Sequence, residues 1–429
     1  MKRSLAGTAL GAAASLALLT GCGVAASSSG SSSPGTSSAS ASSTASSTIN
    51  NAVGAQFSGG KSGAASSSAT PITVGMINQQ GGQVSDPEAS AAVQAAFSYI
   101  NAEQDGIGGH PLKLSLCTVQ SSEAQAQQCA QSLLNNKSVS VILQGGLNVG
   151  SDSVHSTLNG AKPDVVAQAN PGTDTTAANT YAINPSVIAA LPGTGSYAKS
   201  KGYKSVAIVV DSNPGDIAIA QVAKGIYASM GLTSKVTTFP VGSTDLTSAF
   251  TAALASKPDA IAPIVVTTSG CTAVAKALQT LGTSTPVLAS GLCVTPQIKT
   301  ALGDFPKWDY ETTNLSQYAS DSTGQVAFYQ AVMAKYAGPN AQLGIDAPAS
   351  FGTAFVLADV LNKIGPDKIT PQSVSAGMKA YTGGVILGTP KVTFGSVKSM
   401  PTLSGLADLF YVYQGNGNWT ATSWQGLPG

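Results

Sequence analysis

The sequence predicts an α/β fold made of two domains, each built on a parallel β-sheet. From residue 71 onward, short runs rich in apolar and β-branched residues alternate with helical runs. This alternation is typical of βαβ units, and it restarts at about residue 186. A chain of 429 residues is also long enough to bury two separate hydrophobic cores.

The N-terminus has the pattern of a secretory signal peptide over residues 1–21. Lys2 and Arg3 precede a short apolar stretch that ends at Leu19. The stretch is too short to span a bilayer as a retained helix. Its end, Leu19-Thr-Gly-Cys22, resembles a bacterial lipobox, which implies that Cys22 carries a lipid and becomes the mature N-terminus. The alternative is an ordinary leader with a chance cysteine.

Residues 22–70 follow as a segment of almost only Ser, Ala, Gly and Thr. Such a composition offers too little apolar surface to offset the entropy of ordering, so the sequence predicts a disordered linker. A coil of this length reaches roughly 35–40 Å. A lipid at Cys22 with this linker would anchor the protein to the outer face of the cell membrane, outside the cytoplasm.

The first domain is expected to begin with a strand at 72–77. Ser85-Asp86-Pro87-Glu88 is typical of a helix start, and the helix is expected to continue through Ile100. Further strands of this domain are predicted at 112–117, 139–143 and 165–168.

The second domain repeats this pattern and is followed by more helices and strands. Gly231 and Gly282 are expected to close two of its helices. Its predicted strands are 205–210, 236–239, 260–266 and 286–289, and its helices are 215–230, 246–255 and 271–281. Beyond them we expect helices at 324–336 and 349–364 and strand-like runs at 385–394, 406–413 and 419–424.

Composition and motifs exclude several classes of function. With 21 Lys and Arg against 20 Asp and Glu, the chain lacks the basic face that nucleic-acid binding needs. The sequence has no GxxxxGK[ST] loop and no G-x-S-x-G turn at a plausible strand end, so we expect no enzyme and no cofactor. His110 and His155 are interpreted as surface or locally hydrogen-bonded residues.

The cysteines other than Cys22 number four, an even count that suggests disulfides in an exported protein. Proximity along the chain favours Cys117 with Cys129 and Cys271 with Cys293, although four cysteines permit three connectivities. Zinc binding is the rival interpretation. No CxxC motif or neighbouring histidine supports it, so we expect no metal site.

Residues 71 to about 424 resemble the type I periplasmic binding proteins, in the branched-chain amino-acid branch that serves ATP-binding-cassette (ABC) importers. The order and spacing of several segments carry the resemblance. They are Ile72-Thr-Val-Gly-Met-Ile77, Tyr99-Ile-Asn-Ala-Glu-Gln-Asp-Gly-Ile-Gly-Gly109, Gln127-Gln-Cys-Ala130, Tyr203-Lys-Ser-Val-Ala-Ile-Val-Val-Asp211 and Val385-Ile-Leu-Gly-Thr-Pro-Lys-Val-Thr-Phe394.

The resemblance implies two Rossmann-like lobes joined by a three-strand hinge, with crossovers near residues 184, 314 and 388. Lobe 1 would comprise residues 71–184 and 315–388, and lobe 2 residues 185–314 and 389–429. It further implies a monomer whose lobes close over a small molecule and then dock on the membrane subunits of an ABC permease.

In lobe 1, the resemblance places the ligand against two loops that follow strands, 145–151 and 169–174. Backbone donors beside a helix N-terminus suit an anionic group. Their candidate side chains are Asn148, Ser151, Asn170 and Thr173, and the alternative is that these residues only form turns and helix caps. Gln79 and Gln80, at the end of the first strand, are further candidates.

Lobe 2 departs from the family pattern. Relatives place a carboxylate for the ligand's ammonium after the strand equivalent to 286–289, where this chain has Ser290-Gly-Leu-Cys293. Asp211 is a possible substitute, with capping of the next helix as its alternative role. Thr267, Thr268 and Ser290 are the other lobe-2 candidates. Phe351 aligns with a family aromatic that faces the ligand, with ordinary core packing as the alternative.

These loops are rich in hydroxyl groups and poor in charge, which favours a polar or weakly anionic ligand. The sequence therefore predicts a lipid-anchored solute-binding protein that captures a small molecule, such as an amino acid, amide or carboxylate, for an ABC importer. The alternative is a ligand sensor of the same fold that serves a membrane signalling receptor.

Overall fold

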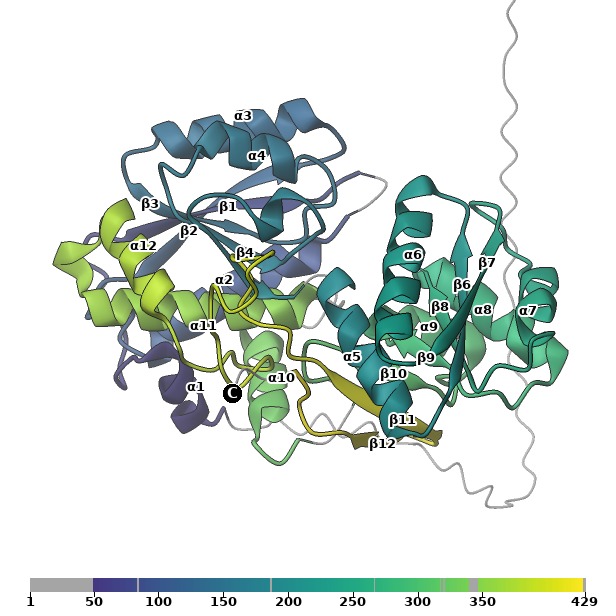
Figure 1. Ribbon diagram of the computed structural model, residues 1–429. Coiled ribbons are helices and arrows are strands. Elements are labelled where there is room, and N and C mark those ends of the chain that lie inside the picture. The colour runs from purple at the N-terminus through teal and green to yellow at the C-terminus, as the bar shows by residue number, and fades with distance from the viewer. Residues whose placement is uncertain are drawn as a thin grey trace, which may run out of the picture. The chain divides into compact units, whose positions relative to one another are not determined.

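The computed structural model describes residues 49–426 except 83–84, 186, 266, 317, 319–320 and 339–345, and it also omits the side chains of 187–189. Strands and helices alternate along most of this range (Figure 1). The helices are α1 (Asn51–Ser58), α2 (Pro87–Glu103), α3 (Glu123–Asn135), α4 (Ser151–Leu158), α5 (Val187–Ser200), α6 (Pro214–Ser229), α7 (Thr247–Leu254), α8 (Thr268–Leu281), α9 (Pro296–Leu302), α10 (Gln325–Tyr336), α11 (Asp346–Ile364) and α12 (Pro371–Ala380), with short 3-10 turns η1 (Thr173–Thr175), η2 (Gly291–Cys293) and η3 (Pro366–Lys368). The strands are β1 (Ile72–Gln79), β2 (Leu112–Val119), β3 (Val139–Gln144), β4 (Asp164–Gln168), β5 (Thr180–Asn184), β6 (Ser205–Asp211), β7 (Thr233–Phe239), β8 (Ala260–Ile264), β9 (Leu288–Ser290), β10 (Asp309–Thr312), β11 (Leu409–Gly415) and β12 (Asn418–Ala421).

Lobe 1 is built on a parallel sheet in the order β2-β1-β3-β4-β5. Figure 1 shows α3 and α4 on one side of this sheet and α2 and α11 on the other. Successive residues of a strand point to opposite faces, so Val74 and Met76 join the core with α2 and α11 while Ile77 joins the core with α3 and α4. Burial on both faces explains why the inner strands β3 and β4 are mostly apolar, whereas the edge strand β2 is partly exposed.

Lobe 2 carries β7-β6-β8, which is parallel, and β12-β11-β10-β9, in which β9 and β10 are parallel and the last strands antiparallel. A bridge between Ile261 and Val287 links the two sheets edge to edge. The predicted α/β fold with parallel sheets is confirmed. The sequence analysis gave no bounds for β5 and β10, nor for α1, α3, α4, α5, α9 and α12.

The chain crosses between the lobes after β5, after β10 and before β11. The third crossover was expected near residue 388, but residues up to Ser404 still contact lobe 1. Leu403 forms a bridge with Ala182 of β5, and the Ser404 N–H donates to the Ala182 carbonyl at 2.9 Å. The structure therefore places this crossover between Ser404 and Leu409.

The strand-like run expected at 385–394 is wrong, because the described residues there form turns. The Val385 N–H donates to the Thr389 carbonyl at 2.8 Å, and Leu387 has a φ of 63°. The glycines and proline around this segment interrupt a ladder, although its Val and Ile side chains are buried in the lobe-1 core. The Leu387 carbonyl accepts a 2.6 Å bond from the N–H of Leu315, so the turn touches the second crossover.

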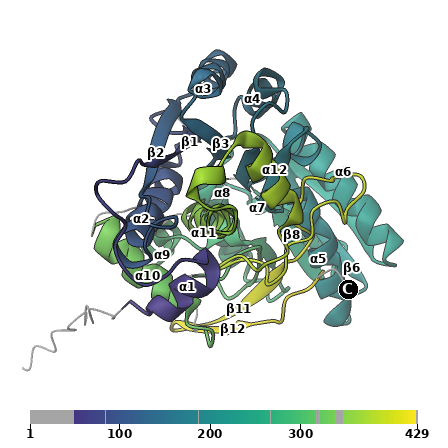
Figure 2. The same cartoon turned by 90° about the vertical axis from the view of Figure 1, so that its left-hand side faces the viewer.

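The predicted disordered linker is also shorter than expected, because its last part forms α1 beside α11 (Figures 1 and 2). Asn50 caps this helix, and the Asn362 amide donates to the Ser58 carbonyl at 2.9 Å. The Tyr99 hydroxyl donates to Asn51 at 3.1 Å. Composition alone missed the helix because its contacts come from residues far along the chain.

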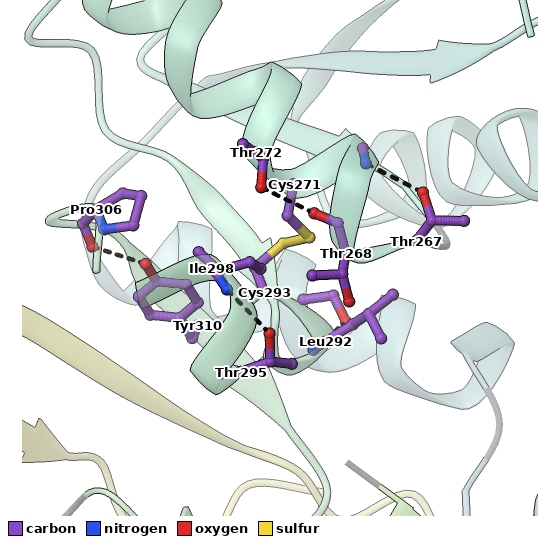
Figure 3. The surroundings of a disulfide bond; sticks show 12 residues. Thr267, Thr268, Cys271, Thr272, Leu292, Cys293, Thr295, Ile298, Pro306 and Tyr310 are labelled. Atoms are coloured by element: carbon purple, nitrogen blue, oxygen red, sulfur yellow. Dashed lines mark hydrogen bonds between the residues drawn. A yellow bond between two sulfur atoms is a disulfide. The ribbon is translucent and has the colours of Figure 1, made fainter. Parts of the chain in front are cut away.

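Both disulfides favoured by proximity are present. Cys117–Cys129 joins β2 to α3 with the Cα atoms 5.6 Å apart, and Cys271–Cys293 joins α8 to η2 with a separation of 5.5 Å. Figure 3 shows the second bond, with Thr268 on the first turn of α8 and the Tyr310 ring close to Cys293. This disulfide fastens the first turn of α8 to the loop after β9.

Among the helices of the described residues, none has the length and apolar character needed to cross a membrane.

Candidate ligand-binding site

The two predicted ligand contacts at the end of β1 are Gln79 and Gln80. Their side-chain oxygens accept hydrogen bonds from other residues of the protein. Gln79 is 1% exposed, and its Oε1 accepts the N–H groups of Asn148 at 2.8 Å and Val149 at 3.1 Å. The Oε1 of Gln80 accepts from Asn78 at 3.0 Å and from the Ser90 hydroxyl at 2.9 Å. Gln79 therefore fixes the loop after β3 from beneath, while Asn148 at its surface is exposed.

Four lobe-1 candidates lie on two loops that the structure brings together. The Asn170 amide, after β4, donates to the Leu147 carbonyl, after β3, at 2.9 Å. Ser151 and Thr173 lie at the first residues of α4 and η1. These loops follow neighbouring parallel strands, so their polar groups gather at the carboxyl edge of the sheet.

Asp174 connects both loops, which the sequence analysis did not foresee. Its carboxylate accepts the Ser151 hydroxyl and, at 2.7 Å, the Asn170 N–H. Burial raises the pKa of Asp174, and these two hydrogen bonds counteract the rise. The Ser151 hydroxyl is thus used inside the protein.

His155 was interpreted as a surface or locally bonded residue, but it is 7% exposed and lies beneath the same loops. Its Nε2 is 3.0 Å from Asp164 and 3.7 Å from Asp174, and its Nδ1 is 2.7 Å from the Thr173 hydroxyl. The sequence could have indicated that His155 is buried, because His155 lies on the face of α4 that also carries the buried residues Val154 and Leu158.

The lobe-2 candidates Thr267 and Ser290 serve as caps. Thr267 Oγ1 accepts the Gly270 N–H at 3.0 Å at the start of α8, and Ser290 Oγ accepts the Leu292 N–H at 3.2 Å. Thr268 is the first residue of α8 and is partly buried. Its own carbonyl accepts the hydroxyl of Thr272 at 3.1 Å (Figure 3).

Asp211, at the end of β6, accepts the Asn213 N–H at 2.8 Å, while Asn213 itself caps α6. Burial and the neighbouring Asp211 carboxylate raise the pKa of Asp216. Asp211 therefore lies in a locally acidic turn, and it supports the helix cap indirectly.

Comparison with known protein families identifies the fold and its class. A family described as periplasmic binding protein matches residues 71–400. The chain belongs to this periplasmic binding protein family. Its members act outside the cytoplasm.

Solved structures agree with this fold, although their sequences are distant. An ABC transporter substrate-binding protein from Sphaerobacter thermophilus has a TM-score of 0.71 and 18% identity, with 83% of this chain and 98% of that one covered. The leucine-binding protein LivK from Thermotoga maritima has a TM-score of 0.65 and 15% identity, with 82% and 98% covered. A solute-binding protein from R. palustris in complex with 4-hydroxybenzoate has a TM-score of 0.66 and 18% identity, with 81% and 95% covered. Among curated proteins, no significant sequence match is found.

In this periplasmic binding protein, Phe351 is a core residue. It is fully buried, and its ring lies 5.1 Å from Tyr329 and 4.9 Å from Phe355, centroid to centroid. Of the two roles left open by the sequence, this geometry supports core packing.

A cavity of about 40 Å³ lies at the second crossover. Its walls come from the loop after β9, from β10 and the residues after it, from β11 and from the start of α11. They are Gly291, Val294, Tyr310, Thr312, Asn314, Leu315, Ser316, Tyr318, Pro348 and Tyr411. None of the predicted ligand contacts lines it, although Ser290 is adjacent to Gly291. The cavity is far smaller than a typical ligand pocket, so it fits one group rather than a whole ligand.

A group of acidic residues lies next to the lobe-1 loops. Asp86, Glu88 and Asp346 each bring a carboxylate oxygen within 4.8 Å of the others, and Asp86 is 3.3 Å from the Asn148 amide. Burial raises the pKa of Glu88 to about 7 and of Asp346 to about 8, with neighbouring carboxylates adding to both shifts. These are the described residues whose spacing would suit a cation.

Proposed function

We propose that this periplasmic binding protein is the extracytoplasmic solute receptor of an ABC importer, which captures a small polar molecule between its lobes and passes it to a permease. Membership of the family supports the receptor role. The observation that carries the site is the gathering of loop donors at the carboxyl ends of β3 and β4, joined by the bond between Asn170 and Leu147. Structures with the same fold include a leucine-binding protein and one in complex with 4-hydroxybenzoate, so the fold accommodates chemically different ligands.

The site would use polar groups that remain available at both lobes. Asn148 is exposed at the lobe-1 loop, and no described residue hydrogen-bonds to the Thr268 hydroxyl in lobe 2. Binding would draw the lobes together because a ligand that contacts both stabilises the closed arrangement over the open one. The lobe-2 loops lack a free carboxylate after β9, which favours a polar or weakly anionic ligand.

Asn148→Ala and Thr268→Ala should each weaken ligand binding by about tenfold, the effect of losing one well-formed hydrogen bond to the ligand. Asn170→Ala should weaken binding by a similar factor because it removes the bond that joins the two lobe-1 loops. A thermal-shift screen of the mature protein against amino acids, amides, carboxylates, aromatic acids and sugars would identify a ligand first. At 100 times its Kd, a ligand stabilises the folded state by about 2.7 kcal/mol. Calorimetry would then compare the variants.

Thr280→Ala is the matched control, because Thr280 is exposed on the last turns of the same helix, α8, and bonds only to the Lys276 carbonyl. The affinity of Thr280→Ala for the ligand should equal that of the parent protein. If all three site variants also bind normally, the ligand lies elsewhere, and the cavity at the second crossover becomes the next place to test.

We also propose that Cys22, which lies outside the described residues, carries the lipid anchor. Cys22→Ala should move the protein from the membrane fraction to the soluble fraction, since a lipid chain contributes about 0.8 kcal/mol of membrane binding per buried methylene. Fractionation of cells followed by immunoblotting measures this. Unchanged retention of the variant in the membrane fraction would argue against the lipobox.

A further inference from the structure

Beneath the two lobe-1 loops lies a buried ionisable network centred on His155. Asp164 and Asp174 are each 2% exposed, and they approach the Nε2 atom of His155 from β4 and η1. Gln144 of β3 contacts both His155 and Asp164. One side chain of α4 is therefore tied to two strands and to the loop after β4.

The polar partners of the imidazole favour its charged form. The Thr173 hydroxyl donates its one hydrogen to the Asp152 carboxylate at 2.5 Å, so it can only accept from His155 Nδ1. Nε2 is 3.0 Å from an Asp164 oxygen, which accepts, and 3.1 Å from the Gln144 amide nitrogen, which donates. The imidazolium donates to both Thr173 and Asp164, whereas a neutral ring that donates to Thr173 can only accept at Nε2, from Gln144.

This network holds the two lobe-1 loops that the proposed function places beside the ligand. Asp174 receives the hydroxyl of Ser151 and the N–H of Asn170, which brings the start of α4 against the loop after β4. Neutral His155 has one donor instead of two, so it keeps Thr173 only by giving up the bond to Asp164. Two buried carboxylates, Asp164 and Asp174, then lie beneath the loops without a cation between them.

We propose that His155, as an imidazolium, is a positioning residue that keeps the loops 145–151 and 169–175 in one arrangement, and that their order falls when His155 loses its proton. The importance of this loop order for ligand capture rests on the proposed function. The dependence of the loop order on the charge of His155 does not. The role is one of positioning, because no ligand needs to touch the imidazole.

The charged groups around His155 favour protonation. Asp152 on its own helix, Asp164 on β4 and Asp174 on η1 are all acidic, while Glu123 of α3 bonds Ser153 and Lys162 bonds the Leu133 and Asn136 carbonyls instead. Burial opposes the charge, but the hydrogen bond to Asp164 and the acidic neighbours outweigh it and raise the pKa of His155. Its contribution to loop order is therefore complete below about pH 6.5 and is lost as the pH rises through the folded-state pKa.

Hydrogen exchange of the full mature protein tests this without a ligand. The amides to follow are those of Asn148, Val149 and Asn170, whose N–H groups bond to Gln79 and Asp174. After correction for intrinsic exchange rates, their protection should fall about tenfold more than that of the β6 amides between pH 5.5 and pH 9. In His155→Gln, protection should be low at both pH values.

His110→Gln is the matched control, since His110 is the other histidine and bonds to the Thr70 carbonyl away from these loops. It should keep the pH response of the parent. If the corrected protection of the three amides in the parent protein does not change with pH, the proposal is overturned. Because the parent series needs no substitution, poor folding of His155→Gln would not prevent the test. A protein that binds no compound of the ligand screen would leave this result standing and would instead count against the proposed function.

Discussion

Phe351→Ala should lower the free energy of unfolding by about 3–5 kcal/mol, the range for removing a fully buried aromatic ring. The ring of Phe351 is completely shielded and packs edge-on against Tyr329 and at a tilt to Phe355. Its removal leaves a cavity between α10 and α11, which helices that cover one face of the lobe-1 sheet cannot easily close. Urea denaturation followed by circular dichroism measures the loss.

The same variant decides between the two roles that the sequence left open for Phe351. A core residue affects stability and leaves ligand affinity unchanged under conditions where the protein is folded. Phe57→Ala, on α1 at the edge of the same core, should lower the free energy of unfolding by less than Phe351→Ala does, because Phe57 is only partly buried. A loss of stability under about 1 kcal/mol combined with a loss of binding would place Phe351 against the ligand instead.

The regular elements were predictable because hydrophobic periodicity is local. The strands of the lobe-1 sheet that the sequence placed, β1 to β4, begin and end within about two residues of their expected limits, since short runs rich in apolar and β-branched residues mark them. The misassigned segments depend on distant contacts. Residues 51–58 have the composition of a linker, and Tyr99 and Asn362 hold them as a helix.

For the site, the sequence predicted where polar groups would gather but not how they would be used. Asn148, Ser151, Asn170 and Thr173 do lie on adjoining loops, because the carboxyl ends of neighbouring parallel strands share an edge. The side-chain oxygen of Gln79, however, accepts a hydrogen bond from a loop 69 residues later, and the Ser151 hydroxyl donates to Asp174. No pattern of nearby residues contains such pairings, so the role of Asp174 was missed, and the helical spacing that indicates burial of His155 does not indicate its partners.

A second unforeseen pair, Glu311 and Asp408, should make the protein less stable as the pH rises. Glu311 lies on β10 opposite Phe410, and Asp408 directly precedes β11. Asp408 is 1% exposed, and neither of its carboxyl oxygens has a hydrogen-bond partner among the described residues. Glu311 Oε1 is likewise buried without one. Burial and the charge of Asp408 raise the pKa of Glu311 to about 8, and burial raises that of Asp408 to about 7.

The sign of the effect follows from proton binding. Between about pH 4 and pH 8 the folded chain holds protons on these two groups that the unfolded chain has already released. Stability therefore falls with rising pH across that window. Glu311→Gln and Asp408→Asn keep the shape without the charge, so each should stabilise the protein at pH 8 by roughly 1–3 kcal/mol and change little at pH 4. Melting curves at both pH values measure this.

Asp245→Asn provides the opposite control, because Asp245 is an exposed carboxylate whose pKa is lowered by hydrogen bonds from Thr247 at the start of α7. Its removal should not raise the melting temperature at pH 8. If Glu311→Gln melts at a lower temperature than the parent protein at pH 8, Glu311 is not a buried acid without a partner. Such a result would mean that the ionised carboxylate has a cationic partner in solution. Since Glu311 lies in register with Ser290, one of the predicted ligand contacts, that result would direct the ligand search towards amines.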